Sequence, residues 1–237
     1  MKTNIALLLA VSIAIVGCNN TAKTPAAGPT PTKGGTDQKA ENPTVASIPA
    51  ELKKDAFDYY GLGNEQPIDM EVVQSGGATS TTGTQYVTLK EVKGGEAIFE
   101  IGRTGNLEMY GTQTVTLNDK GVYLTSSTTA DIEGDRLELP NDLTPGRTWK
   151  NHLKIKGERE MDVVMNCKVV GVQKFTTKAG EREGLLITAS GSGTLGGQKV
   201  TMDSKSWYVR GKGGLKSELV TTMPDGKKQI VTIQETK

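Results

Sequence analysis

The sequence predicts an all-β fold, and three features of residues 49–237 support that prediction. Apolar and polar residues alternate along many short segments, which is the pattern of strands with one buried and one solvated face. Glycine-rich turn sequences separate these segments, such as Gly94-Gly95 and Asn118 to Gly121. No long stretch repeats with the period of an amphipathic helix. Together these features predict an antiparallel sheet of about ten strands.

The expected elements are one short N-terminal helix followed by strands. Residues 50–60 follow a proline and carry apolar side chains along one side, which predicts a helix that ends at Gly61. Residues 75–84 are rich in glycine, serine and threonine and are expected to form a long loop. The predicted strands are residues 70–73, 85–92, 97–101, 111–117, 122–127, 136–139, 149–156, 162–172, 184–192, 198–209, 216–222 and 229–236.

The first eighteen residues have the pattern of an export signal. Met1-Lys2 is positively charged, and residues 5–16 are apolar apart from one serine, a run too short to span a bilayer. The run ends in Ile15-Val16-Gly17-Cys18, which resembles the lipobox of bacterial lipoproteins. That resemblance implies cleavage before Cys18 and acylation of its thiol. The alternative is an ordinary signal peptide that happens to end in a cysteine.

The lipobox divides the chain into three parts. Residues 1–17 are expected to be the signal peptide. Residues 18–48 comprise the acylated cysteine and a disordered tether, because a segment rich in threonine, proline, alanine and glycine buries too little apolar surface to fold. Residues 49–237 form the β-domain. Several acyl chains make membrane attachment stable, and by resemblance to enterobacterial lipoproteins Asn19 favours the outer membrane, facing the periplasm.

Composition argues against several classes of partner. The chain carries 28 Lys and Arg against 27 Asp and Glu, a formal net charge of +1, and the two signs are interspersed. No basic stripe indicates binding to nucleic acid, and no polybasic segment indicates binding to anionic lipid. Aromatic residues make up 5% of the chain, which is few for a surface that stacks bases or sugars.

Three later segments resemble a known group of proteins. Leu139 to Trp149 carries a proline, a glycine and then a tryptophan, Val172 to Ile187 leads through a small-residue turn into a strand, and Trp207 to Leu219 joins Trp-Tyr to Leu-Lys-Ser through glycines. In this order they are similar to a family of secreted and lipid-anchored bacterial β-domains of unknown function, sometimes labelled TapB-like. The resemblance covers roughly residues 56–235 and implies a curved antiparallel sheet or half-barrel with one short helix.

Trp149, Trp207 and Tyr208 are the candidate ligand-binding residues. Large aromatic side chains on strands either anchor a core or line a groove in the sheet. Ordinary core packing is the favoured interpretation of the tryptophans, and a ligand groove is the alternative.

The sequence contains no recognisable catalytic or metal-binding motif. Cys167 lies in an alternating strand pattern and has no disulfide partner if Cys18 is acylated, so it is expected to be buried and inert. His152, the single histidine, has no supporting motif beside it. Asp131, Glu133 and Asp135 lack the further ligands of a calcium loop. We therefore predict no catalytic residue, no metal and no cofactor.

These observations favour a lipid-anchored, non-enzymatic protein of the cell envelope. Its β-domain would bind either an apolar ligand or an envelope protein. The first alternative is a structural or assembly role, in which an exposed sheet edge pairs with a strand of a partner. The second alternative is an envelope hydrolase.

Overall fold

The computed structural model describes residues 43–75, 80–134, 136–157 and 160–237. In these residues the structure consists of one antiparallel sheet of thirteen strands and very little helix, so the predicted all-β class is confirmed. The predicted signal peptide, Cys18 and most of the predicted tether lie outside the described residues. Ile48, the last residue of the predicted tether, is 3% exposed and packs in the core, so the fold includes residues ahead of the expected boundary.

The strands follow the chain with few interruptions. They are β1 (Ile68–Gln74), β2 (Ser80–Lys93), β3 (Glu96–Gly105), β4 (Gln113–Leu117), β5 (Gly121–Ser127), β6 (Asp131–Ile132), β7 (Arg136–Pro140), β8 (Thr148–Lys156), β9 (Met161–Thr177), β10 (Gly180–Leu195), β11 (Gln198–Val209), β12 (Gly213–Thr222) and β13 (Lys228–Glu235). The helical elements are η1 (Val45–Ser47), η2 (Ala50–Leu52), α1 (Asp55–Tyr60) and η3 (Asn106–Tyr110). None of these helices has both the length and the apolar character needed to cross a membrane.

Two local predictions were wrong. The predicted helix over residues 50–60 is divided into η2 and α1, because so short a helix is marginal alone and packing of its apolar side chains decides its geometry. Residues 80–84, expected in a loop, begin β2 and pair with β1 on one side and, from Gly83 onward, with β3 on the other. The threonines there are β-branched and suit an extended backbone once partners are available.

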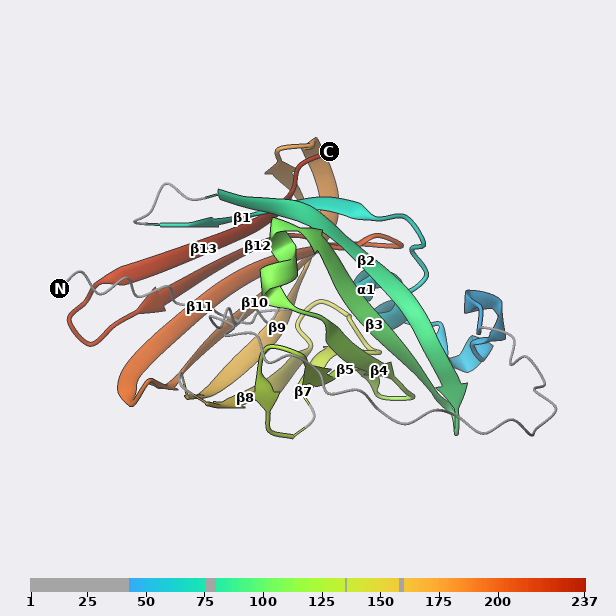
Figure 1. The fold of residues 1–237 in the computed structure, drawn as a ribbon, viewed down its shortest axis with the longest axis horizontal. Coiled ribbons are helices and arrows are strands. Elements are labelled where there is room, and N and C mark those ends of the chain that lie inside the picture. Colours follow the sequence, from blue (N-terminus) through green and yellow to red (C-terminus); the bar gives the residue numbers. More distant parts are fainter. Residues whose placement is uncertain (1–42, 76–79, 135, 158–159) are drawn as a thin grey trace, which may run out of the picture.

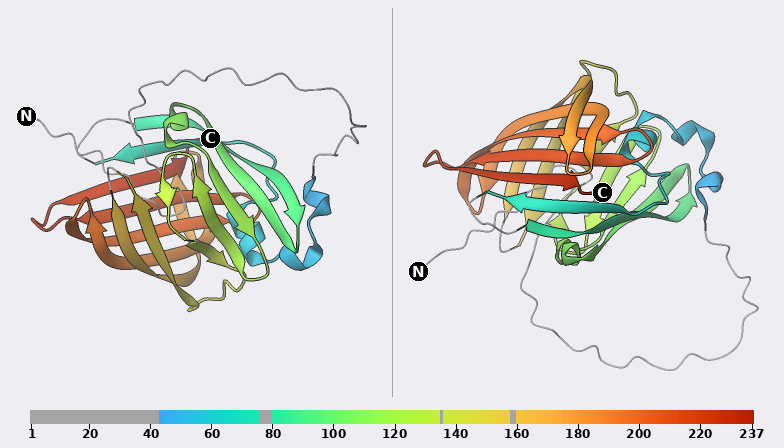
Figure 2. Two further views of the ribbon diagram at one scale, coloured as in Figure 1. Left: turned by 60° about the horizontal axis from the view of Figure 1, so that its bottom comes forward. Right: turned by 90° about the horizontal axis from the view of Figure 1, so that it is seen from above.

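The sheet curls until its two ends come together (Figures 1 and 2). The strand order is β6-β8-β9-β10-β11-β12-β13-β1-β2-β3-β4-β5-β7. After β5 the chain therefore crosses to the opposite edge for β6, returns for β7 and crosses again for β8. The edge strand β7 contacts β8 at the opposite end without pairing with it. Each edge is therefore short or faced by another strand.

The main core lies on the inner face of the curled sheet. Alternate residues of β3, β4, β8, β9 and β10 point into it, with Phe99, Leu117, Leu153 and Val163 at 2% exposure or less. Large apolar side chains occupy many of the inward positions and pack closely with one another.

Helix α1 covers one end of this core. Its Ala56, Phe57 and Tyr60 are buried. Arg210, in the β11–β12 turn, holds the helix from outside by ion pairs with Asp55 (Nη2–Oδ1 2.6 Å) and with Asp58.

The β9–β10 hairpin bends out of the sheet near its tip. Gly171 has φ +131°, and the register between the two strands shifts at Leu186/Ile187. Such bulges bend a strand locally. Residues 175–186 thereby fold over the outer face of neighbouring strands, beside the C-terminus at the top of Figure 1, and cover a second small apolar cluster.

Candidate functional site

Trp149 joins the two ends of the sheet. It lies half-buried on β8 and packs against the main core. Its indole Nε1–H donates a hydrogen bond of 3.2 Å to the carbonyl oxygen of Leu137 on β7. The indole thus connects two strands that share no ladder, which is a structural role.

Trp207 belongs to the small cluster under the β9–β10 tip. Its ring stacks on Phe175 with centroids 5.7 Å apart and an interplanar angle of 23°. Leu186 and Leu215 complete the cluster, and Lys216 Nζ lies 5.4 Å from the Trp207 ring centroid. Trp207 is therefore a core residue on the outer side of the sheet, the opposite side from Trp149.

Tyr208 faces the interior near α1. It is 3% exposed and borders, with Tyr60, a cavity of about 40 Å³ between β1–β3 and β11–β13. The hydroxyls of Ser206 and Ser217 meet there at 2.9 Å. Burial, reinforced by the negative charge of Glu138, raises the pKa of Tyr60 well above its ordinary value. A cavity of this size holds about three water molecules.

The three predicted aromatic residues thus do not form one groove. Trp149 bridges the ends of the sheet, Trp207 packs under the tip, and Tyr208 borders a small internal cavity.

The interior also contains charged groups, each with a polar or charged partner. Arg136 Nε and Glu138 Oε1, both on β7, lie 2.7 Å apart with side chains 5% and 2% exposed. Arg103 donates to the Gly111 carbonyl and to Gln113 Oε1, both at 2.8 Å. Burial lowers the pKa of the Arg103 guanidinium to about 10. Paired charges of this kind fit the interior of a structural core.

The cysteine and the histidine do not cooperate. Cys167 is buried, and burial raises the pKa of its thiol to about 12, so the nucleophilic thiolate is disfavoured. His152 lies on the outer side of β8, where its Nε2 is 2.8 Å from Asp162 Oδ1 in an exposed pair. Among the described residues no group of three or more metal-ligating side chains occurs.

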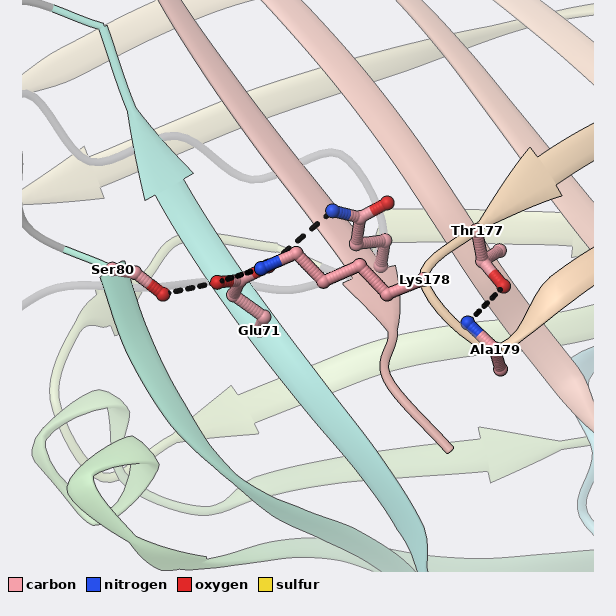
Figure 3. Close-up of polar contacts among 6 residues, drawn as sticks. Glu71, Ser80, Thr177, Lys178 and Ala179 are labelled. Atoms are coloured by element: carbon pink, nitrogen blue, oxygen red, sulfur yellow. Dashed lines mark hydrogen bonds and ion pairs between the residues drawn. The ribbon is translucent and has the colours of Figure 1, made fainter.

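A buried carboxylate on β1 holds the β9–β10 tip (Figure 3). Glu71 is 3% exposed, and its Oε1 and Oε2 both lie 2.7 Å from Lys178 Nζ, which reaches it from the tip. The Ser80 hydroxyl donates to Oε1, and Gln234 Nε2 donates to Oε2 at 3.3 Å. Hydrogen bonds from Lys178 and Ser80 lower the pKa of the Glu71 carboxyl.

A second ion pair of the same kind lies beside the first. Arg182, also in the tip, places its Nε 3.0 Å from Oε2 of Glu235 on β13, whose side chain is 5% exposed. Thr177 fixes the turn between the two cations by accepting from the Ala179 N–H at 3.2 Å (Figure 3). The tip is therefore clasped to β1 and β13 by two buried carboxylates.

A broad hollow lies on the outward-facing side of β8 to β12, with a volume of about 920 Å³. Its floor consists of two cross-strand rows that flank the inward-facing Cys167, Ala189 and Ser204. They are Thr148–Lys168–Thr188–Lys205–Glu218 and Lys150–Asn166–Ser190–Asp203–Val220. Within the described residues Lys150, Lys168 and Lys205 form no ion pair.

Trp149, named from the sequence as a candidate groove residue, is among the residues that line this hollow, but sequence reasoning identified neither the lysines of the hollow nor the clasp. The three lysines come from three separate strands, and only the strand register places them together. Each sits at a polar position of an alternating strand, where a lysine ordinarily indicates a solvated face. The local pattern contains no signal that distinguishes these lysines from the others.

The fold is shared with solved structures of bacterial proteins. A candidate lipoprotein from Parabacteroides distasonis ATCC 8503 aligns with a TM-score of 0.52 at 14% identity, covering 75% of this chain and 97% of that chain. A candidate exported protein from Bacteroides fragilis NCTC 9343, described as having a YmcC-like fold, aligns with a TM-score of 0.51 at 12% identity, covering 76% and 98%. At these identities the similarity establishes the fold alone. The comparison with curated proteins gives no match.

The family model described as DUF3108-like matches residues 100–224, more than half of the chain. The chain therefore belongs to the DUF3108-like family. The predicted relation to a family of β-domains is confirmed as membership of the DUF3108-like family. The TapB-like label stays a prediction.

Proposed function

We propose that this protein is a lipid-anchored protein of the cell envelope whose β-domain binds an envelope partner without catalysing a reaction. The lipobox-like sequence ending at Cys18 supports the anchor. The two structures of similar fold are described as a candidate lipoprotein and a candidate exported protein, which agrees with an envelope location. Asn19 favours the outer membrane, with the domain in the periplasm.

The observation that carries the proposal is the contrast between a filled interior and an open outer hollow. The internal cavity beside Tyr208 is about 40 Å³, far below the roughly 300 Å³ of an ordinary small-molecule site. The outer hollow on β8 to β12 is broad, and hydroxyl, amide and ammonium groups that can form hydrogen bonds line it. A partner that binds from outside fits this arrangement better than an apolar ligand carried within.

The two other candidate functions find less support. Pairing of a partner strand needs a free edge, but β6 has two residues and β7 is faced by β8 through the Trp149–Leu137 hydrogen bond. A cysteine hydrolase needs its thiol beside a base. Cys167 points inward while His152 points outward on the neighbouring strand, so these two groups cannot act together.

Site-specific photo-crosslinking in the native bacterium tests partner binding. A photoreactive amino acid would replace Thr188, at the centre of the hollow, and in a matched control Thr116, an outward-facing threonine of β4. We expect a crosslinked adduct at position 188 and none at 116. Equal labelling at both positions, or none at either, would overturn the proposal.

Two further measurements test the lipid anchor and the carriage of an apolar ligand separately. Labelling with radioactive palmitate should mark the wild-type protein and not Cys18→Ala, which tests the anchor. Native mass spectrometry of the gently purified protein should give the mass of the lipoprotein alone. An additional lipid-sized adduct that is lost on denaturation would instead favour carriage of an apolar ligand.

A further inference from the structure

We infer that the hollow on β8 to β12 binds an anionic polysaccharide chain, whose carboxylate or phosphate groups meet Lys150, Lys168 and Lys205. The inference rests on the proposed function, because it assigns the chemical class of the partner that occupies the same hollow.

The three lysines form a compact cationic group. Lys168 and Lys205 lie in one cross-strand row with Thr188 between them, so their Cα atoms are two strand spacings, roughly 10 Å, apart. Lys150 lies in the adjacent row, opposite Asn166 and next to the strand of Lys168. At physiological ionic strength the Debye length is about 8 Å, so exposed charges roughly 10 Å apart are largely screened from one another, and an anionic chain would have to contact the lysines directly.

Eight of the eighteen described lysines form an ion pair and ten do not; Lys150, Lys168 and Lys205 are three of those ten, and they differ from the rest in lying together in one hollow. The paired lysines are Lys90, Lys154, Lys156, Lys174, Lys178, Lys216, Lys227 and Lys237. A positive charge without a partner beside others of its sign gains from an anion supplied from outside, and such complementary charges guide association.

The polar groups between the lysines suit a sugar chain. Thr148, Thr188 and Ser190 offer hydroxyls, and Asn166 offers an amide, so hydroxyl groups of a polysaccharide can both donate and accept hydrogen bonds along the rows. A hollow accommodates a single chain, whereas the headgroup plane of a bilayer is flat. Trp149 is the one aromatic residue among the described residues that line the hollow. Its ring packs against the main core while its indole N–H donates to Leu137, so the hollow offers no row of free aromatic rings for stacking bases, which disfavours single-stranded nucleic acid.

Two acidic residues border the lysines and provide an internal test. Glu218 Oε1 forms an ion pair with Lys216 Nζ at 2.9 Å. Asp203 has no ion pair among the described residues and lies in the same row as Lys150, so it opposes an anionic ligand. Removing its charge should strengthen binding, a result that a merely structural role for the hollow would not produce.

The experiment measures binding of soluble chains to the detergent-solubilised full-length protein by titration calorimetry. The probes are a galacturonate oligosaccharide, a phosphomannan oligosaccharide and, as the neutral control, a malto-oligosaccharide of similar length. We expect at least one acidic chain to bind and the neutral chain not to bind. Binding should weaken as sodium chloride is raised, because salt screens exposed charges. The carboxylated and phosphorylated probes distinguish the two sources of negative charge.

Variants assign the binding to the hollow. Lys168→Glu combined with Lys205→Glu should lower the affinity by about tenfold or more, and Asp203→Asn should raise it by about twofold to threefold. Lys120→Glu, at an exposed lysine of the β4–β5 turn that also has no ion pair among the described residues, is the control and should change the affinity by less than about twofold. Circular dichroism melting verifies that each variant folds.

The outcomes separate this inference from the proposed function. If neither acidic chain binds, or if Lys120→Glu lowers affinity as much as the hollow variants, the inference is overturned. Binding to vesicles containing phosphatidylglycerol without binding to either soluble chain would assign the hollow to the membrane and likewise overturn it. A crosslink at position 188 together with no affinity for acidic chains would keep the proposed function and refute its polysaccharide partner.

Discussion

The tip and the root of the β9–β10 hairpin have outer faces of opposite character. At the tip, Phe175 and Leu186 are buried against Trp207, and Lys178 and Arg182 are paired with buried carboxylates. At the root, the same two strands present Lys168 and other polar side chains to the open hollow. Both regions alternate apolar and polar residues, yet one is a second core and the other an open surface.

The difference lies in what covers each face. The bulge at Leu186/Ile187 turns the tip onto β1 and β13, where its cations find carboxylates of the same chain. At the root, Asp203 and Glu218 lie in the same rows, but neither forms an ion pair with the three lysines of the hollow in the described part of the chain. Charges satisfied internally stabilise the fold, whereas charges without internal partners remain available for an external one.

The largest expected effect is at the tip cluster. Trp207→Ala removes a buried indole that stacks on Phe175 and should lower the free energy of unfolding by about 3–5 kcal/mol. Urea denaturation followed by circular dichroism measures it. Trp207→Phe is the matched control. Because Trp207 Nε1 has no hydrogen-bond partner among the described residues, phenylalanine should cost less than about 1.5 kcal/mol. Equal losses for both variants would contradict the cluster as described.

The next effect is at the clasp. Glu71→Gln keeps the size of the side chain but removes the charge that binds Lys178, and should cost about 1–2 kcal/mol near neutral pH. The fold lowers the pKa of Glu71, so its charge stabilises the protein above the ordinary value of 4.5, and that contribution is lost as the pH falls through the folded pKa. The difference in free energy of unfolding between the wild type and Glu71→Gln should therefore become smaller in acid.

Thermal melting between neutral pH and acid pH measures this difference. The control is Glu181→Gln, which removes an exposed pair with Lys174 and should change stability by less than about 0.5 kcal/mol. If the difference in stability between the wild type and Glu71→Gln stayed constant with pH, the ionised Glu71 carboxylate would not be the group that holds the tip.

The strands and the short helix could be predicted because alternation and turn residues are local signals. Trp207 was expected to anchor a core, and it does, but on the outer face under a folded-over hairpin. That location depends on a bulge and on contacts such as Glu71 with Lys178, 107 positions apart in the chain. Local patterns carry no information on such register and pairing, which is also why β2 begins earlier than predicted.

The candidate site was predicted less well than the fold. Trp149, Trp207 and Tyr208 were grouped because they are aromatic, yet the curvature of the sheet places them in three environments. The lysines of the hollow were overlooked because each resembles any solvated strand residue. Cys18 lies outside the described residues, so its acylation stays a prediction.

A smaller effect is expected where the two ends of the sheet meet. Trp149→Phe keeps most of the packing and removes the indole N–H that binds the Leu137 carbonyl, so unfolding should become easier by about 0.5–1.5 kcal/mol. Hydrogen exchange followed by mass spectrometry should show faster exchange in β7 and β8 and unchanged exchange in β9 and β10. Uniformly faster exchange would mean that Trp149 supports the whole core rather than this junction.

The smallest effect on stability should come from the root of the hairpin. Lys168→Ser removes a charge without an ion pair, so the free energy of unfolding should change by less than about 0.5 kcal/mol. Lys178→Ser, at the tip of the same hairpin, also removes an exposed lysine. It leaves the buried Glu71 carboxylate without its cation, which should lower the free energy of unfolding by about 1 kcal/mol. The two substitutions are chemically identical, so a difference in urea denaturation between them reports only what each lysine contacts. If Lys168→Ser proved as destabilising as Lys178→Ser, the root would be part of the structural framework, and its lysines would not be free to bind a partner.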